Sequence, residues 1–515
     1  MGIVNAWKGL WSSGDGFVKN PSVIKKPFRR GYDAATPSRL TSNWSTTNAS
    51  ADASLKGAMA PLRYKSRDLV RNSPFARQAV RAIESNTIGP TGIKLQAQIK
   101  QQRGKKLDAK INENVERTWK EWCRYDSCHT AGRLCFNDIE KVITRSLVVD
   151  GEVFVRFVRK PFGRSKIPFA LELLEADQLD SDFTGKSSRK KNTWRMGIEQ
   201  DEFGRAIQYA FLKKHPGDTA FGTPVGQREH MMIPASEICH IFVSTRPSQS
   251  RGEPWLSSSI LALHHLSGFQ EASVIRARAA SSLMGFISSP EGELDQGGEV
   301  FDGERVSQFE PGKFSYLQPG ESVTVPDFDS PNSEFPEFMS AMLRSVASGC
   351  GISYESVSKD FSKTNYSSSR LSLLEDRSHY RSLQNYLIEN FHSRVFDAWL
   401  EMAVLSGVLS LPNYDTEPER YRKVRWVPRG WDWIDPQKEI VAAKEAIKAG
   451  LRTQADVIAN QGGDIEELLP QRKAEVEAAQ QLGLVFDTDV ASTTQKTGTN
   501  IETSANSQTN GRKKA

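Results

Sequence analysis

The sequence has 515 residues, of which 38% are hydrophobic and 25% are charged, and its formal net charge is +6. These values are typical of a globular protein that can bury a sizeable core and hold several structural units. A net charge this small for the length argues against a protein that grips nucleic acid tightly over a broad face.

The first 60 residues are predicted to form an arm that is extended or disordered on its own. A basic cluster at residues 25–30 precedes a run rich in Ser, Thr, Asn and Ala from Ala34 to Ser54. That run has too few large apolar groups to offset the entropy lost on folding. We expect the arm either to lie on a neighbouring subunit or to be a plain floppy terminus. Its first residues lack the apolar core of a signal peptide.

Residues 61–254 mix helical and strand patterns, which predicts an α+β body. Apolar residues at three-and-four spacing predict helices at residues 62–71, 75–85, 107–122 and 136–149. Alternating patterns predict strands at residues 93–97, 151–157, 170–174, 206–212 and 238–243. The polar runs 185–191 and 216–228 are expected to be exposed loops.

A helix rich in small residues is predicted from about Trp255 to Met284, directly after Pro254. Small residues let helices approach closely, so this helix is expected to pack against copies of itself or against a partner helix. An ordinary core helix fits the periodicity nearly as well. Residues 288–331 carry frequent Gly and Pro between short apolar pairs, which predicts a small β-rich insert.

The stretch from Ser333 to Gly407 predicts a helix, a polar loop and a second, long helix. The first helix covers residues 333–349, and the loop at 356–367 is rich in hydroxyl groups and carries two lysines. The second helix has no internal Gly or Pro, so it is expected to run about 40 residues, or roughly 60 Å. Its apolar residues predict one buried stripe, at Leu373, Leu374, Leu383, Tyr386, Leu387, Phe391, Val395, Phe396, Trp399 and Leu400. The pattern therefore indicates a lever that carries a loop toward something large and anionic.

The C-terminal part predicts an aromatic strand and then short helices. Residues 426–434 are strand-like, and Asp435 with Pro436 begins a helix that ends at Lys448. Thr453 and Asp456 form a predicted capping box. Residues 464–482 form a charged segment that Pro470 is expected to interrupt, and beyond residue 487 a mobile tail is expected.

Two groups of residues are candidates for chemistry. An acidic group could bind a cation for phosphodiester chemistry, at Glu175, Asp177, Asp180 and Asp182. No His or Lys motif accompanies it, so the signal is weak. A second group, Cys123, Cys128, His129 and Cys135, suggests zinc but lacks paired Cys-x-x-Cys knuckles, which favours partly buried helix cysteines.

The sequence contains neither a phosphate-binding Gly-rich loop followed by Lys and Ser or Thr, nor a Gly-x-Ser-x-Gly elbow. The five cysteines are scattered and make no disulfide framework, which favours a reducing compartment. No stretch approaches about eighteen uninterrupted apolar residues, so no membrane span is expected. We therefore expect no catalytic residue, no metal and no cofactor. A metal-dependent nuclease or another nucleic-acid-processing enzyme, using the acidic group, is the alternative.

Short segments in chain order resemble one known family. They are residues 72–77 (Asn-Ser-Pro-Phe-Ala-Arg), 151–154 (Gly-Glu-Val-Phe), 173–177, 197–199, 201–205, 246–255, 353–355, 360–362, 365–370 and 428–431 (Pro-Arg-Gly-Trp). Together, from about residue 33 to 484, they resemble the lambda-type portal proteins of tailed bacteriophages. The resemblance implies a ring, usually of twelve subunits, at one vertex of the capsid in the virion. A separate terminase pumps double-stranded DNA in through its axial channel, and the DNA leaves the same way.

The resemblance also implies a division of the α+β chain. The expected parts are an arm (1–60), a wing (61–254), a first stem helix (255–287), a clip (288–332), a second stem helix (333–349), a tunnel loop (350–368), a long kinked helix with a return to the wing (369–434), a helical crown (435–485) and a disordered tail (486–515). The clip is expected to meet terminase and later the head-completion or adaptor proteins. The ring is expected to nucleate the shell of major capsid and scaffold proteins in the host cytoplasm.

The tunnel loop supplies the candidate residues of the DNA channel, which are Lys359, Asp360, Lys363, Thr364 and Asn365. Ring symmetry would repeat the two lysines of each chain as two rings of positive charge around the channel, and the negative charge of Asp360 would partly neutralise them. Alternatively, both lysines only solubilise an exposed loop.

Overall fold

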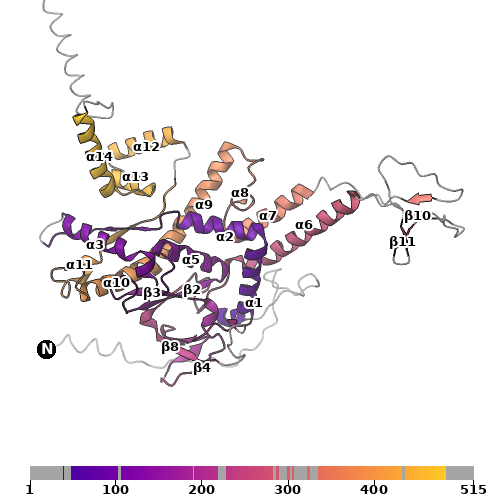
Figure 1. The fold of residues 1–515 in the computed structure, drawn as a ribbon, viewed down its shortest axis with the longest axis horizontal. Helices are drawn as coiled ribbons and strands as arrows, with labels where there is room; N and C mark the ends of the chain where they lie inside the picture. The colour runs from indigo at the N-terminus through magenta and orange to yellow at the C-terminus, as the bar shows by residue number, and fades with distance from the viewer. Residues whose placement is uncertain are drawn as a thin grey trace, which may run out of the picture. The chain divides into compact units, whose positions relative to one another are not determined.

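The computed structural model describes residue 39 and residues 48–102, 106–189, 191–218, 228–281, 286–288, 299–301, 304–306, 322–324, 335–431 and 435–482. The chain divides into two compact units, Met1–Ala49 and Ser50–Ala515, and every element named below belongs to the second. Helices and antiparallel sheets alternate along it (Figure 1), which confirms the predicted α+β class.

The first helix, α1 (Ala51–Asn72), begins earlier than predicted, so residues 51–60 of the expected arm are helical. The Ser50 hydroxyl caps it by accepting a hydrogen bond from the Ala53 amide at 3.2 Å. Pro61 lies inside the helix, where a proline removes one backbone hydrogen bond, but Leu55 and Met59 are buried and hold this part of the helix in place. Helix α2 (Pro74–Thr87) follows after Ser73.

Two antiparallel sheets form the body of the second unit. In the smaller, β2 (Glu152–Val158) lies between β3 (Ala170–Leu174) and β9 (Ile238–Phe242). The larger contains, in spatial order, β4 (Gly185–Lys186), β5 (Thr193–Arg195), β6 (Ile198–Gln200), β7 (Ala206–Leu212) and β8 (His230–Pro234). Strands β2, β3, β7 and β9 were predicted within one residue. The other four were not: β4, β5 and β6 are very short, and β8 has no alternation of apolar and polar residues.

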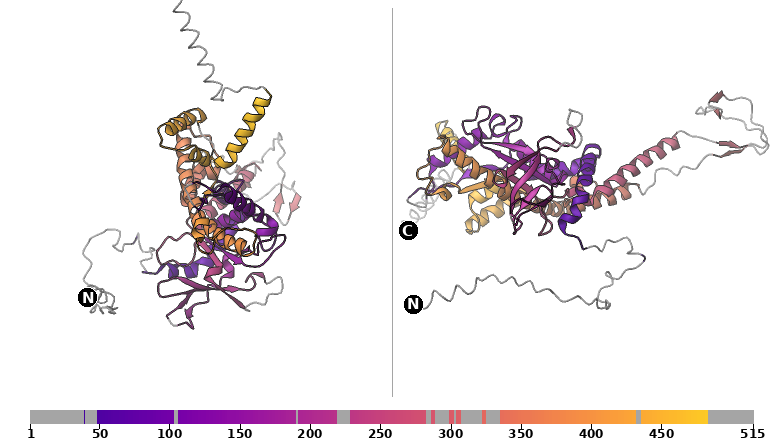
Figure 2. Two further views of the ribbon diagram at one scale, coloured as in Figure 1. Left: turned by 90° about the vertical axis from the view of Figure 1, so that its left-hand side faces the viewer. Right: turned by 90° about the horizontal axis from the view of Figure 1, so that it is seen from below.

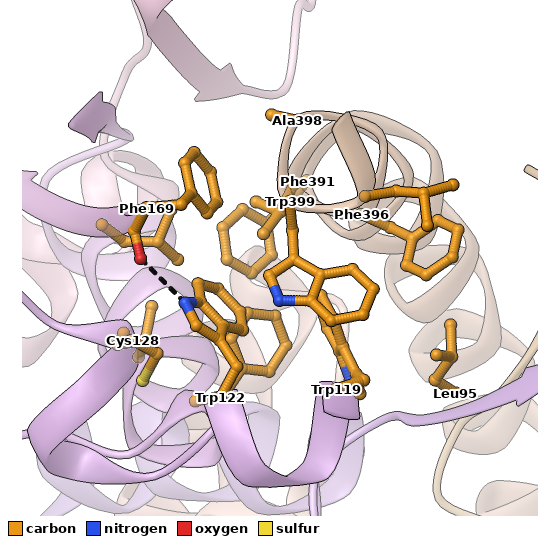
Figure 3. Close-up of a cluster of buried hydrophobic side chains, with 14 of the residues drawn as sticks. Leu95, Trp119, Trp122, Cys128, Phe169, Phe391, Phe396, Ala398 and Trp399 are labelled. Carbon is orange, nitrogen blue, oxygen red and sulfur yellow. Dashed lines mark hydrogen bonds between the residues drawn. The ribbon is translucent and has the colours of Figure 1, made fainter. Parts of the chain in front are cut away.

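An aromatic core joins distant parts of the chain, as Figure 3 shows. It lies between α3 (Ala109–Trp122), α5 (Phe136–Val149) and the later helix α10 (Ser393–Leu405). The rings of Trp119 and Trp399 meet edge to face with centroids 5.0 Å apart, and Trp122 Nε1 donates a hydrogen bond to the Phe169 carbonyl at 2.8 Å. Buried aromatic rings contribute large apolar areas, so this core fixes α10 against the body.

Strand β1 (Lys94–Ala97) pairs antiparallel with β14 (Val424–Val427), which brings the chain after α10 back to the body. The predicted strand 426–434 is therefore displaced: residues 428–431 are not in a strand, and 432–434 lie outside the described residues.

Helices α6 (Ile260–Ser281) and α7 (Phe335–Cys350) lie side by side, and Figure 2 shows them extending together from the body. Ser259 Oγ donates to the Val346 carbonyl at 3.3 Å, and a side chain at Gly349 would overlap that hydroxyl. The small-residue helix thus packs against a partner helix within its own chain.

Two antiparallel strand pairs are described between α6 and α7. Strand β10 (Phe286–Ser288) pairs with β13 (Ser322–Thr324), and β11 (Glu299–Phe301) pairs with β12 (Glu304–Val306). Strands were predicted in this insert, most of whose residues lie outside the described part of the chain.

The predicted long helix is present and continuous. It consists of α9 (Tyr366–Leu387), a π-helical turn (Ile388–His392) and α10. The predicted buried stripe is wrong at its start, because Leu373 and Leu374 are 44% and 48% exposed. Within the described residues, no element covers that side of α9, whereas the stripe is buried from Leu383 to Leu400.

Three helices, α12 (Pro436–Lys448), α13 (Gln454–Asn460) and α14 (Ile465–Gln481), complete the described chain. Thr453 and Asp456 form the predicted capping box. The expected interruption at Pro470 is wrong, because α14 runs through it and loses a single backbone hydrogen bond on an exposed surface. Among the described helices, none combines the length and hydrophobicity that a membrane span requires.

Candidate functional site

The predicted loop consists of a short helix, α8 (Tyr354–Ser358), and an exposed turn that leads into α9. Gly351, at φ +68°, turns the chain out of α7. Lys359 ends α8 in the left-handed conformation, at φ 58°, and its amide donates to the Glu355 carbonyl at 3.0 Å. A left-handed lysine is uncommon, so the surrounding contacts must hold this turn in place.

Asp376 of α9 fixes the start of α8. One carboxylate oxygen accepts from the Ser353 amide at 2.8 Å, and the other accepts from the hydroxyls of Ser353 at 2.6 Å and Ser356 at 2.9 Å. Asp376 is only 6% exposed, and hydrogen bonds to an ion are stronger when water is excluded. The base of the loop is thereby tied to the long helix.

Apolar packing holds the other side of α8. Val357 is 1% exposed and belongs to a core shared with α2, α7 and α9. Gln78 of α2 donates to the Ser356 carbonyl at 3.1 Å, and the Arg344 guanidinium lies 5.3 Å from the centre of the Tyr354 ring. The loop therefore rises from a base that three helices and one carboxylate hold.

The five predicted channel residues have different surroundings. Lys359 and Lys363 are exposed. Asp360 accepts from the Ser362 amide at 3.0 Å and from the Tyr354 hydroxyl at 3.1 Å. The Ser362 hydrogen bonds are the main reason that the pKa of Asp360 lies below its ordinary value, and Lys363 adds a smaller electrostatic contribution. Asp360 therefore keeps its charge beside the lysines.

The last two predicted residues shape the turn. Thr364 Oγ1 donates to the Phe361 carbonyl at 2.9 Å. Asn365 caps α9, because its side-chain oxygen accepts from the Ser368 amide at 2.9 Å. Of the five, only the two lysines present charged groups without a role in holding the turn.

The acidic group proposed for a metal is divided between two sets of ion pairs. In the first set, Asp177 binds Arg67 at 2.5 Å and Arg63 at 3.5 Å, and it lies near Glu175 and His215. Glu175, Asp177 and His215 are close enough to hold a metal ion. A cation there would have to compete with the two guanidiniums that already neutralise Asp177.

In the second set, Asp180 accepts from His230 Nε2 at 2.8 Å and from Arg228 at 3.1 Å, and Arg228 also binds Asp182 at 2.9 Å. Burial acts to raise the pKa of Asp180, but the hydrogen bonds from His230 and the Asp182 amide lower it below its ordinary value. The four carboxylates thus act as partners of basic side chains.

Two cysteines of the second candidate group have hydrogen-bonded thiols. Cys128 Sγ donates to the Cys123 carbonyl at 3.5 Å, and Cys135 Sγ donates to Asp138 at 3.1 Å. Burial raises the pKa of Cys128 to about 12 and that of Cys123 well above its ordinary value. Within the described residues, the group whose ligand atoms lie close enough together to hold a metal ion is Glu175, Asp177 and His215, and no cysteine belongs to it. This geometry favours the interpretation as helix cysteines.

Sequence reasoning missed a buried ionic cluster around Glu152, the first residue of β2. Glu152 is completely buried and binds Arg63 at 2.5 Å, Arg251 Nε at 2.7 Å, His240 at 3.0 Å and the Gly252 amide at 2.8 Å. Burial opposes ionisation, but Arg251 and Arg63 hold the pKa of Glu152 well below its usual range. The cluster ties α1, β2 and β9 to the segment that leads into α6.

Two glycines make this close approach possible. A side chain at Gly151, which has φ +86°, would overlap the backbone of Glu253, and one at Gly252 would overlap the Gly151 carbonyl. The signal in the sequence was a glutamate at the start of a mostly apolar strand, because a buried charge needs a partner.

Comparisons with known proteins point to one family. Residues 37–384 match a family model described as phage portal protein, lambda family. The probable portal protein of Halomonas phage phiHAP-1 is 29% identical over 494 residues, which cover 93% of this chain and 92% of that protein. Portal protein B of Escherichia phage lambda is 23% identical over 481 residues, which cover 86% of this chain and 88% of that protein.

Solved structures with a similar chain come from gene transfer agent (GTA) particles. A chain in the neck of an empty GTA particle is 14% identical, with a TM-score of 0.42 and coverage of 77% of this chain and 93% of that chain. A chain in the virion of a native GTA particle is 12% identical, with a TM-score of 0.41 and coverage of 79% and 93%.

Proposed function

The chain belongs to the lambda family of phage portal proteins, and from this premise we propose that it closes into a ring of identical subunits, twelve by family resemblance, at one vertex of the capsid. A separate terminase drives double-stranded DNA into the head through the axial channel, and the DNA leaves by the same channel. In this function the protein itself makes and breaks no covalent bond.

The exposed lysines at the tip of the α8–α9 loop carry the proposal for the channel. Duplex DNA has one negative charge per about 1.7 Å of its axis, so many strong contacts would stall its passage. Each subunit offers Lys359 and Lys363, and the ionised Asp360 between them offsets part of their charge. Ring symmetry repeats this weak positive charge around the axis and gives many equivalent, individually weak contacts.

The anchoring of the loop supports the same role. Asp376 and Val357 fix α8 to elements that are packed in the core, while the lysines remain exposed. A loop held at its base keeps its tip at one radius from the axis in every subunit. The lysines of all subunits can contact moving DNA equally only if their loop tips lie at the same distance from the axis.

Exposed apolar side chains on α9 support the assembly of subunits. On α9, Leu371, Leu373 and Leu374 are 70%, 44% and 48% exposed in the single chain, and Phe361 of the turn before α9 is 61% exposed. Large exposed apolar side chains that are close together in the chain are typical of an interaction surface. In the ring, this part of α9 is covered by the neighbouring subunit.

The other parts of the chain receive the roles expected from the family. We assign α6 and α7 to the stem and β10 to β13 to the clip, which docks the terminase large subunit and later the head-completion proteins. Residues 61–254 form the wing and 435–485 the crown. During assembly in the host cytoplasm, the ring nucleates the shell of major capsid and scaffold proteins.

Electron microscopy and native mass spectrometry of the purified full-length protein test the ring. Hollow rings of a single subunit count are expected, with residues 359–363 facing the opening. A protein that stays monomeric or dimeric at high concentration, or a ring whose loop faces away from the opening, would contradict the proposal.

The alternative, a metal-dependent nuclease, makes an opposite prediction. Incubation of the protein with supercoiled plasmid and about 5 mM Mg²⁺ is expected to leave the DNA uncut, because the carboxylates concerned are bound to Arg63, Arg67 and Arg228. Cleavage that is lost in Asp177→Asn would instead support the nuclease.

A further inference from the structure

A basic cleft lies where the end of α1, the start of α2 and the end of α5 meet. It has a volume of about 600 Å³, and its lining includes Arg67, Arg71, Arg77, Arg81 and Arg145. Among the residues that the structure describes, Asp150 is the one carboxylate in the lining. We call it the arginine cleft. It shares no residue with the loop at Lys359.

Two of the five arginines maintain the walls of the cleft. Arg67 binds Asp150 at 2.7 Å and Asp177 at 2.5 Å. The charges of Arg67 and Asp150 therefore neutralise each other and are not available to a ligand. Arg77 donates to the carbonyls of Val70, at 3.2 Å, and Arg71 at the end of α1. These contacts fix the corner between α1 and α2.

The remaining guanidiniums are available to a ligand. Arg71 and Arg81 are exposed, and within the described part of the chain their side chains make no hydrogen bond or ion pair. Arg145 pairs with Glu84 at 3.0 Å, but its side chain is 55% exposed and such surface pairs are weak. Three cationic groups from three helices therefore converge on one hollow without a carboxylate to neutralise them fully.

The chemistry of the lining indicates which anion fits. Guanidinium groups bind phosphate oxygens in pairs of parallel hydrogen bonds. The other lining side chains, including Val70, Ser146 and Val149, offer no aromatic ring on which a nucleobase could stack. The cleft is thus suited to the phosphates of a nucleic acid rather than to its bases.

We infer that the arginine cleft binds the phosphodiester backbone of double-stranded DNA, without sequence preference, at a second site separate from the Lys359 loop. The inference rests on the proposed function, because DNA is the phosphate polymer that a portal meets. Free phosphate shares the same chemistry, so the experiment must separate the two sources.

The test measures binding of a fluorescent duplex of about 20 base pairs to the full-length ring between about 50 and 200 mM salt. The variant is Arg71→Ala with Arg81→Ala, and the matched control is Lys56→Ala with Lys65→Ala, which removes two exposed charges of α1 outside the cleft. Loss of two phosphate contacts should weaken binding roughly tenfold or more near 100 mM salt and flatten the slope of log K against log salt by about 2. The control variant should change neither the affinity for the duplex nor the salt slope by a comparable amount.

A conservative variant separates a binding role from a folding role. Arg71→Lys with Arg81→Lys keeps both charges, so most of the salt slope should return even though paired hydrogen bonds are lost. When Lys359→Ala and Lys363→Ala are also present, Arg71→Ala with Arg81→Ala should weaken duplex binding by the same factor as before. If the protein forms no ring at all, the proposed function fails, whatever the cleft binds.

Three results would overturn the inference. Duplex binding in Arg71→Ala with Arg81→Ala could equal that of the control. Inorganic phosphate could bind in an arginine-dependent way while duplex binding is unchanged, which would assign the cleft to a free anion. Loss of the ring in both cleft variants, but not in the control, would show that the cleft instead receives an acidic segment of a neighbouring subunit.

Discussion

His392 Nε2 of the π-helical turn lies 2.5 Å from Glu140 Oε1 of α5, and both side chains are almost completely buried. His392 Nδ1 lies 3.0 Å from the Leu387 carbonyl, which can only accept, so this nitrogen carries a proton. Glu140 also accepts from the Ile93 amide at 3.1 Å. One carboxylate thus joins the middle of the long helix to α5 and to the start of β1.

Replacement of Glu140 by Ala should destabilise the protein by about 3–5 kcal/mol, because it leaves His392 Nε2 and the Ile93 amide buried without a partner. Urea unfolding followed by circular dichroism measures the loss. Glu389→Ala, at an exposed position of the same π-helical turn, is the control and should change the free energy of unfolding by about 0.5 kcal/mol or less. Equal effects of the two substitutions would show that the buried contact contributes nothing.

Glu152 should make stability depend on pH in the acid range. Its pKa in the folded state is held well below the unfolded value of about 4.3, so its contribution is present above that value and is lost as the pH falls through the folded pKa. Glu152→Gln should cost about 3–5 kcal/mol at pH 7 because Arg63 and Arg251 stay buried and lose their counter-charge. It should also flatten the decline of stability below about pH 4.5. Exposed Glu202→Gln should keep the decline, and an unchanged decline in Glu152→Gln would refute the assignment.

Asp376→Ala should release the base of the loop while the rest of the long helix stays folded. Three hydrogen bonds from Ser353 and Ser356 lose their acceptor, at a cost of about 2–3 kcal/mol. Hydrogen exchange should therefore accelerate at residues 353–365 and stay unchanged in α10. The neighbouring exposed substitution Glu375→Ala serves as the control. Uniform acceleration across both regions would mean that Asp376 supports the whole fold rather than the loop.

Lys359→Ala with Lys363→Ala should leave ring assembly normal and reduce packaging or retention of DNA, because the positive charge at the channel is removed. Packaging is measured as nuclease-protected DNA per particle, and rings are counted by electron microscopy. The control, Lys56→Ala with Lys444→Ala, removes the same charge from exposed helix positions. Loss of the ring in the loop variant alone would show that the loop is structural.

Glu116 of α3, which lies within electrostatic range of Asp464, Glu466 and Glu467, should make the stability of the start of α14 sensitive to pH. Burial, together with the nearby charges of Glu466, Asp464 and Glu467, raises the pKa of Glu116 to about 7. The folded pKa exceeds the unfolded value of about 4.3, so its stabilising contribution is complete at low pH and is lost as the pH rises through about 7. Protection factors at the start of α14 should be lower at pH 8 than at pH 5.5.

Glu116→Gln is the matched variant for this pH effect. Glutamine keeps an oxygen that can accept from the Ala97 amide, which lies 2.6 Å from the Glu116 carboxylate, but it cannot titrate. The difference in protection between the two pH values should therefore disappear. Persistence of the difference would assign it to another group, such as Glu466, whose pKa burial also raises.

The spacing of apolar residues along the sequence predicted most of the helices and half of the strands in the two body sheets. The predicted helix 136–149 matches α5, and the strands at 170–174 and 206–212 match β3 and β7, because each has apolar residues at the period of its own structure. The short strands β4 and β5 were missed because they are exposed and carry no such period. Leu373 and Leu374 fit the helical stripe but are exposed, since periodicity does not reveal whether another element covers a given turn.

The sequence by itself determined that this chain is an α+β protein of the lambda portal family, with a polar loop between two helices. These features depend on neighbouring residues and on short segments in fixed order. Only the tertiary structure decided that Asp376 anchors α8, that Arg63 and Arg251 neutralise Glu152, and that Arg71, Arg81 and Arg145 converge on one cleft. The energy of a charged side chain depends on the partners and the water around it, and here those partners come from positions up to 99 residues away.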